Sequence, residues 1–255
     1  MDLYRKLAKN PTFSIKDVEE LGINKKTSYY FLDSMMKKEL VKKIRNNIYS
    51  IIDPSTGQIY ANRYQIACAI TDTAYISHHS AFEYYGLANQ VYYEVYVSSK
   101  TRFNHFEYEG IDYKYIASRM DEGVIEAKNT RGIRITDLER TVIDSINDFN
   151  KIGGFEELIN CIDGIHYIDE KGLKKYLDLY DKQILYQRAG YILNQFKADM
   201  KLSDEFINYC KGKIGSSKRY LINDMKENNN LDKEWKLMIP NNMSEIADQG
   251  GSLLV

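Results

Sequence analysis

Hydrophobic and polar positions in the first 40 residues follow the period of an α-helix. Apolar residues recur at three- and four-residue intervals in segments 2–9, 15–21 and 25–39, which predicts three short helices. Ser14 and Asn24 stand directly before the second and third segments and are suited to cap them. The chain is therefore expected to begin with three helices joined by tight turns.

Two β-rich runs follow the third helix. Residues 41–44 and 48–52 are rich in valine and isoleucine, and they flank Arg45, Asn46 and Asn47. Asparagine tolerates a positive φ, so the pattern predicts a β-hairpin. Three helices followed by a hairpin is the element order of a winged helix-turn-helix.

The remainder of the chain predicts a mixed domain that becomes helical towards its C-terminal end. The turn formed by residues 54–57 is the expected linker. The predicted strands are 75–76, 91–98, 106–108, 111–117, 124–127 and 132–135. The predicted helices are 62–70, 77–85, 137–147, 155–162, 170–179, 184–197 and 203–211. Residues 226–230 are polar and are expected to form a loop, while Trp235 is expected to anchor the C-terminal segment.

These patterns define the predicted fold class as α+β. An N-terminal winged helix-turn-helix domain, residues 1–53, is followed by a larger mixed α/β domain with a helical C-terminal portion, residues 58–240. Residues 241–255 show no periodicity and are expected to be an irregular tail.

Charge adds to the case for the N-terminal segment. The 255 residues carry a net charge of −1, but residues 1–53 hold 11 Lys and Arg against 7 Asp and Glu. Within residues 25–45 seven cationic side chains stand against two acidic ones. A local basic stripe on a nearly neutral chain is typical of a surface that binds phosphate.

The basic stripe and the element order together predict contacts to double-stranded DNA. The third helix would present polar side chains near its N-terminus, and the hairpin tip would reach the adjacent backbone or minor groove. The predicted DNA-binding residues are Asn24, Lys25, Lys26, Thr27, Tyr29, Tyr30, Lys42, Lys43, Arg45, Asn46 and Asn47. The alternative is a small helical domain whose lysine-rich face is merely solvated.

Catalytic chemistry has one candidate in the sequence. Asp112 and Lys114 lie two residues apart on a predicted strand, and nucleases use such a pair to hold a divalent ion and orient water. This metal-dependent nuclease is the alternative function, although polar residues on an amphipathic strand are common without catalysis. No phosphate-loop, zinc-ligand or nucleophile-elbow motif occurs. We therefore expect a protein that is not an enzyme and needs no metal or other cofactor.

Compartment and membrane association can also be predicted. No run of apolar residues is long enough to span a bilayer, and the charged N-terminus lacks the apolar core of a secretion signal. The three cysteines are far apart and odd in number. These features predict a cytoplasmic protein with reduced thiols, no structural zinc and no membrane partner.

Six segments resemble one family along nearly the whole chain. They are NNIY at 46–49, AYISHHSA at 74–81, YGL at 85–87, ITDLERTVID at 135–144, QRAGYIL at 187–193 and DKEWKLMIP at 232–240. In order and spacing they resemble the AbiEi family, the antitoxins and transcriptional regulators of a type IV toxin–antitoxin and phage-defence system. One departure is Asn47, where the family leads us to expect a glycine at the wing tip.

The resemblance implies a function that the composition and spacing do not. An N-terminal winged helix would bind promoter inverted repeats and repress its own operon, and the C-terminal domain would supply antitoxin activity and assist cooperative binding of two or more copies. The functional partner would be a nucleotidyltransferase-like toxin that is countered without a stable complex.

Overall fold

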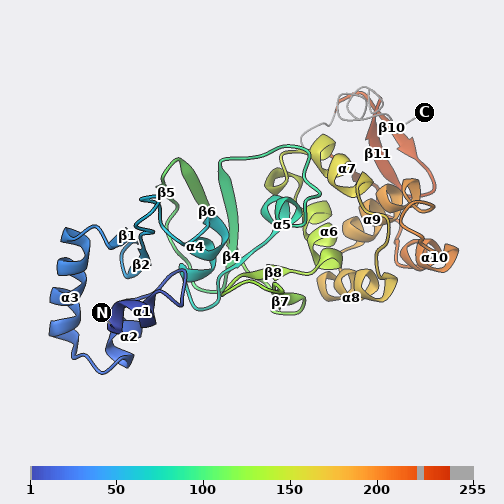
Figure 1. Ribbon diagram of the computed structural model, residues 1–255. Helices are drawn as coiled ribbons and strands as arrows, with labels where there is room; N and C mark the ends of the chain where they lie inside the picture. The colour runs from blue at the N-terminus through green and yellow to red at the C-terminus, as the bar shows by residue number, and fades with distance from the viewer. Residues whose placement is uncertain (1, 223–226, 242–255) are drawn as a thin grey trace. The chain divides into compact units, whose positions relative to one another are not determined.

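The computed structural model describes residues 2–222 and 227–241 (Figure 1). It divides into two compact units. Unit 1 contains residues 1–76 and 92–135, and unit 2 contains residues 77–91 and everything from Thr136 onward. This division differs from the predicted boundary at residues 53–58, because the N-terminal elements share a unit with the middle sheet. Apart from Asn241, the predicted irregular tail 241–255 lies outside the described residues.

The N-terminal elements occur in the predicted order. The helices are α1 (Asp2–Leu7), α2 (Ile15–Glu20) and α3 (Lys25–Lys37), and the hairpin is β1 (Val41–Arg45) with β2 (Ile48–Ile51). Ser14 caps α2 through a reciprocal pair of hydrogen bonds with Asp17, and the Asn24 side chain accepts a hydrogen bond from the Thr27 backbone N–H. These caps fix where the helices begin.

A small apolar core holds the N-terminal elements together. It contains side chains from all three helices, both strands and the segment between α1 and α2. Its most buried members are Leu7, Phe13, Val18, Leu32, Val41 and Ile51. Phe13 and Tyr49 also exchange backbone hydrogen bonds of 2.9 Å, which attach the segment before α2 to the hairpin.

The rest of unit 1 is a six-stranded mixed sheet with one helix, α4 (Arg63–Ala69). The strands are β3 (Tyr75–Ile76), β4 (Glu94–Ser99), β5 (Phe106–Tyr108), β6 (Ile111–Ala117), β7 (Val124–Glu126) and β8 (Arg134–Thr136). Their order across the sheet is β5-β6-β4-β3-β8-β7. The strands β5 and β6 form an antiparallel hairpin, and β6 runs parallel to β4, as Figure 1 shows.

Unit 2 is built mainly of helices around α6. They are α5 (His78–Tyr84), α6 (Leu138–Asn147), α7 (Phe155–Asp163), α8 (Glu170–Tyr180), α9 (Gln183–Gln195) and α10 (Asp204–Gly212). A short 3₁₀ helix covers Phe149–Lys151. The face of α6 that packs on its neighbours includes a buried ion pair, with Arg140 Nε 3.3 Å from Asp144 Oδ2. Buried charges are stable only when paired in this way.

A small sheet completes unit 2 and corrects one prediction. It contains β9 (Arg219–Tyr220), β10 (Asn229–Asp232) and β11 (Leu237–Pro240). Residues 229 and 230 are therefore in a strand, so the predicted loop over 226–230 is wrong there; residue 226 is not described. A polar strand at a sheet edge carries little hydrophobic signal, because its backbone pairing with β11 supplies most of its stabilisation.

The role predicted for Trp235 is confirmed. Its side chain is 2% exposed and lies against Gly190 of α9, where an added Cβ would come within 1.9 Å of the indole ring. The missing side chain at Gly190 therefore makes room for the anchor. These observations support the predicted mixed α+β class. Within the described ranges, no helix has the length and apolar character that crossing a bilayer requires.

Candidate nucleic-acid interface

A tight turn sets the position of α3 relative to α2. The helix α2 ends at Glu20 with Leu21 as its C-cap, and Gly22 follows with φ of +92°, a conformation that side chains disfavour. The chain is extended again at Asn24, where α3 begins. The turn leaves the first two turns of α3 at the surface.

The predicted residues of α3 are all exposed. They are Asn24, Lys25, Lys26, Thr27, Tyr29 and Tyr30, and the two tyrosines are 52% and 67% exposed. The opposite face buries Ser28, Leu32 and Met35 against the N-terminal core. All six residues therefore lie outside the narrow buried stripe of the helix and surround its N-terminal end.

Within this group, capping distinguishes two residues from the others. The Asn24 side-chain oxygen accepts hydrogen bonds from the Thr27 backbone N–H and hydroxyl, at 3.0 and 2.9 Å. Lys25 and Lys26 instead form no ion pair with any residue that the structure describes. Both residues belong to the first turn of α3, where the backbone N–H groups also favour an anion.

The hairpin turn uses an asparagine where a glycine was expected. Asn47 has φ of +60°, within the left-handed region that glycine adopts most easily. Its side-chain oxygen accepts a hydrogen bond of 3.0 Å from the backbone N–H of Ile15, the first residue of α2. Asn47 therefore ties the hairpin turn to α2, which explains the departure from glycine.

The cationic residues of the hairpin do not share one face. Lys43 and Asn46 are exposed, whereas Arg45 is half-buried with its guanidinium 4.4 Å from the ring centre of Phe106. Arg45 Nη1 is buried and has no hydrogen-bond partner within the described ranges. Of the hairpin residues predicted to bind DNA, Arg45 thus packs against β5 in this structure.

Lys42 also points towards the middle sheet. Its ammonium group pairs with the Glu109 carboxylate and lies 5.7 Å from the ring centre of Tyr108. The hydrogen bond to Glu109 raises the pKa of Lys42 above its ordinary value. Glu109 and Gly110 are the two central residues of the β5–β6 turn, both with positive φ (50° and 77°), a geometry suited to a tight hairpin. The turn fixes the position of the carboxylate that receives Lys42.

The sequence alone does not identify the residues of the middle sheet that contact the β1–β2 hairpin. Phe106, Tyr108 and Glu109 stand about sixty residues beyond Lys42 and Arg45 along the chain. The only signal was the predicted turn at Glu109-Gly110, which indicates a hairpin but not its neighbour. Their role depends on tertiary packing.

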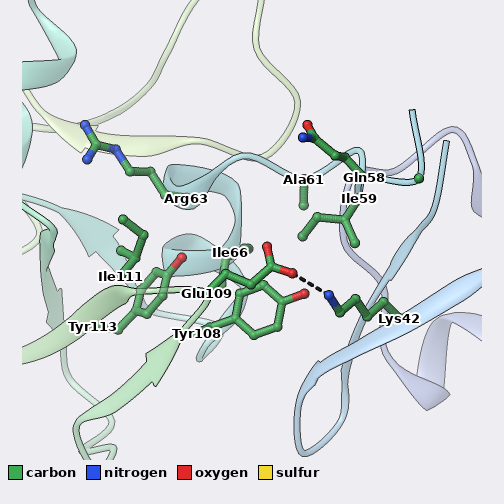
Figure 2. Close-up of a pocket in the computed structure, with 11 residues that line it drawn as sticks. Lys42, Gln58, Ile59, Ala61, Arg63, Ile66, Tyr108, Glu109, Ile111 and Tyr113 are labelled. Carbon is green, nitrogen blue, oxygen red and sulfur yellow. Dashed lines mark hydrogen bonds and ion pairs between the residues drawn. The ribbon is translucent and has the colours of Figure 1, made fainter. Parts of the chain in front are cut away.

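A cavity of about 480 Å³ lies where the hairpin, residues 57–61, α4 and the β5–β6 hairpin meet (Figure 2). Its polar lining consists of Lys42, Gln58, Arg63, Tyr108, Glu109 and Tyr113. Arg63 donates hydrogen bonds to the Tyr92 carbonyl oxygen and the Tyr64 hydroxyl, at 3.1 and 2.9 Å. These bonds fix the direction of the guanidinium beside the cavity.

The proposed nuclease pair lies elsewhere on the sheet. Asp112 and Lys114 are both on β6, and each is paired: Asp112 Oδ1 lies 3.0 Å from His105 Nε2, and Lys114 pairs with Glu94 of β4. Partial burial would raise the pKa of Glu94, but the hydrogen bonds from Lys114 and Tyr96 outweigh it and hold the pKa below its ordinary value. The described part of the chain contains no group of three His, Cys, Asp or Glu side chains placed to hold a metal ion.

Comparison with known proteins supports the fold. The crystal structure of the RV2827C protein from Mycobacterium tuberculosis matches with a TM-score of 0.63 over 92% of this chain and 89% of the other, at 11% sequence identity. No family model matches the chain. No curated protein matches it either. At this identity, the structural match establishes a shared fold and nothing about activity.

Proposed function

We propose that this chain is a DNA-binding antitoxin and transcriptional autorepressor of a type IV toxin–antitoxin operon. In this proposal α1–α3 and the β1–β2 hairpin form a winged helix-turn-helix with α3 as the recognition helix. The observation that carries it is the exposed N-terminal half of α3, whose two lysines have no described ion-pair partner. Free cations beside polar and aromatic groups suit phosphates and base edges.

The two basic elements would have different tasks on DNA. α3 would enter the major groove with Lys25, Lys26, Tyr29 and Tyr30 outward, since its other face is committed to the core. Lys43, exposed on the hairpin, would contact the neighbouring phosphate backbone. Lys42 and Arg45, in contact with the middle sheet, would orient the hairpin.

The antitoxin half of the proposal rests on unit 2 and on the resemblance to the AbiEi family. The segments 135–144 and 187–193, which carry much of that resemblance, contain the buried residues Arg140, Asp144 and Gln187. These three residues therefore belong to the buried part of unit 2. In the proposal this unit counters a nucleotidyltransferase-like toxin without a stable complex, and it assists cooperative binding to promoter inverted repeats.

DNA binding is tested with a fragment from upstream of the chain's own gene. The variant Lys25→Ala/Lys26→Ala/Lys43→Ala should bind it at least tenfold more weakly, and the slope of log K against log salt should fall by about 2.7, since each phosphate contact contributes about 0.9. Fluorescence anisotropy at several salt concentrations measures both quantities.

The matched control removes three exposed lysines elsewhere, in Lys128→Ala/Lys171→Ala/Lys218→Ala. This variant has the same net charge as the test variant, so equal losses in the two would show only a general charge effect. Unchanged binding by the α3–hairpin variant would refute the proposed interface.

The two halves of the function can be separated in cells. The α3–hairpin variant should fail to repress a reporter driven by its own promoter, yet still protect cells that express the neighbouring toxin, because unit 2 is unaltered. Loss of protection together with repression, at equal protein level, would contradict this division. A neighbouring gene without nucleotidyltransferase character would remove the proposed partner.

A further inference from the structure

The hairpin-sheet cavity, defined by the lining described above, has features of a ligand site. Its volume of about 480 Å³ falls in the range of small-molecule pockets, roughly 300–1,000 Å³. Figure 2 shows Lys42 and Arg63 on opposite sides of this space and the two tyrosines between them. Four separate chain segments contribute to its wall, so its shape depends on how they pack.

Two tyrosine hydroxyls at the cavity lack a well-formed hydrogen bond to any residue that the structure describes. Tyr113 is 1% exposed, stacks on Phe106 with ring centres 4.8 Å apart, and points its hydroxyl towards the cavity in Figure 2. The Oη of Tyr108 is buried. Within the described ranges the Tyr113 hydroxyl forms no hydrogen bond, and Tyr108 Oη has only the neighbouring Lys42 and Glu109 groups beside it, without a well-formed hydrogen bond. A buried polar group without a partner costs free energy, and a ligand that supplies an acceptor would remove that cost.

Both hydroxyls are able to donate a hydrogen bond at neutral pH, because burial raises the pKa of each tyrosine. Burial raises the pKa of Tyr113 well above its ordinary value, against the opposing effect of Arg63. The phenol therefore stays protonated at neutral pH and offers an O–H group. A ligand that uses this O–H group therefore has to supply an oxygen that accepts its hydrogen bond.

The charge and the apolar part of the lining further restrict which ligands the cavity can accept. Lys42 and Arg63 carry two positive charges at the wall, and Glu109 carries one negative charge, so the lining has a net charge of +1. Ile59, Ile66 and Ile111 form an apolar part of the wall. The complement of this lining is a small molecule with one anionic group and an apolar or planar body.

We propose that the hairpin-sheet cavity binds a small organic anion, whose acceptor oxygens take hydrogen bonds from Tyr108 and Tyr113 and whose apolar body lies against the isoleucines. The shared chemistry is a carboxylate or phosphate monoester on a ring-sized body. Its negative charge competes with Glu109 for Lys42.

This competition connects the cavity to the hairpin. Lys42 belongs to β1, so a ligand that draws its ammonium group from Glu109 weakens a contact that holds the hairpin to the middle sheet. This consequence for DNA binding rests on the proposed function, whereas ligand binding does not. Occupancy should weaken DNA binding, and by reciprocity DNA should weaken ligand binding by the same factor.

Binding is tested on the full chain by isothermal titration calorimetry with benzoate, adenosine monophosphate and inorganic phosphate. At least one of the two organic anions should bind, at least tenfold more tightly than inorganic phosphate. Tyr113→Phe and Tyr108→Phe each remove one hydroxyl and should weaken binding about tenfold. Tyr93→Phe is the matched control, because Tyr93 is 75% exposed and does not line the cavity.

The outcomes separate the alternatives. Benzoate binding alone identifies a carboxylate site, and adenosine monophosphate binding alone identifies a phosphate-monoester site. No binding of either at millimolar concentration overturns the proposal. Equal affinity for inorganic phosphate would mean an adventitious ion only and would also overturn the proposal. The proposal is likewise overturned if both tyrosine variants keep the wild-type circular dichroism spectrum and bind the anion with unchanged affinity.

The link to DNA is measured with the bound anion at saturation, where promoter affinity should fall at least threefold. Anion binding with unchanged DNA affinity overturns the link. If the protein binds the anion but no DNA, the anion site is supported and the proposed DNA-binding function is refuted. DNA binding without anion binding refutes the site alone.

Discussion

The two basic elements of unit 1 have similar charge in the sequence and different surroundings in the structure. On α3, Lys25 and Lys26 are exposed and form no ion pair within the described residues. On the hairpin, Lys42 pairs with Glu109 and Arg45 lies over Phe106. A count of charges therefore identifies a basic region but does not distinguish cations that face solvent from cations that hold elements together.

The difference has a geometric cause. One face of α3 packs on the N-terminal core, and its basic N-terminal residues lie outside that face. The strand β1 instead has a second layer beside it, formed by aromatic residues and the turn of β5–β6, which receives part of its side chains.

Arg45→Ala should reduce the free energy of unfolding by about 2 kcal/mol, because it removes a partly desolvated cation–π contact and the packing of the arginine stem. Lys43→Ala, at the exposed neighbouring position, should change it by less than about 0.5 kcal/mol. Urea denaturation of both variants measures the difference. Equal effects would mean that the two hairpin cations do not differ in role.

Asn47→Ala should cost about 1.5 kcal/mol, since it loses the hydrogen bond to the Ile15 N–H and places alanine at a positive φ. Asn47→Gly loses only the hydrogen bond and should cost less. Thermal unfolding of the two variants provides the comparison. A glycine variant as unstable as the alanine variant would show that backbone strain contributes nothing at this turn.

The pair of Lys42 and Glu109 should contribute little by itself. Both side chains are about half exposed, so a double-mutant cycle with Lys42→Met and Glu109→Gln should give a coupling of about 0.5 kcal/mol, reduced in high salt. A coupling above about 2 kcal/mol would place the pair in a far less hydrated environment than the structure shows.

The pH dependence of this pair should be smaller still. The folded-state pKa of Lys42 is raised above its ordinary value of 10.5, mainly by the hydrogen bond with Glu109. Its contribution to stability is therefore complete below that value and is lost as pH rises through the folded-state pKa. The stability difference between wild type and Glu109→Gln should be constant near neutral pH and shrink as the pH rises through the raised pKa of Lys42. A difference that grows with rising pH would contradict the assigned direction.

Much of the secondary structure could be predicted because its signals are local. Strands β5 and β6 occur at the predicted residues, and α3 begins at the predicted Lys25 because Asn24 caps it. The strand β10 was missed, since a polar edge strand has no hydrophobic alternation and depends on pairing with β11. The sheet order could not be predicted either, because local patterns do not specify which strands become neighbours.

The candidate site also combines features that local sequence signals predict with features that depend on tertiary packing. Helical periodicity alone placed Lys25, Lys26, Tyr29 and Tyr30 on one exposed surface, because residues on a helix have a fixed angular spacing. The cavity and the contacts of Lys42 and Arg45 join segments that are distant in sequence, and so only tertiary packing decided them. The amino-acid sequence determined which residues carry charge and which helix face they share, while the fold decided which of those charges stay in water.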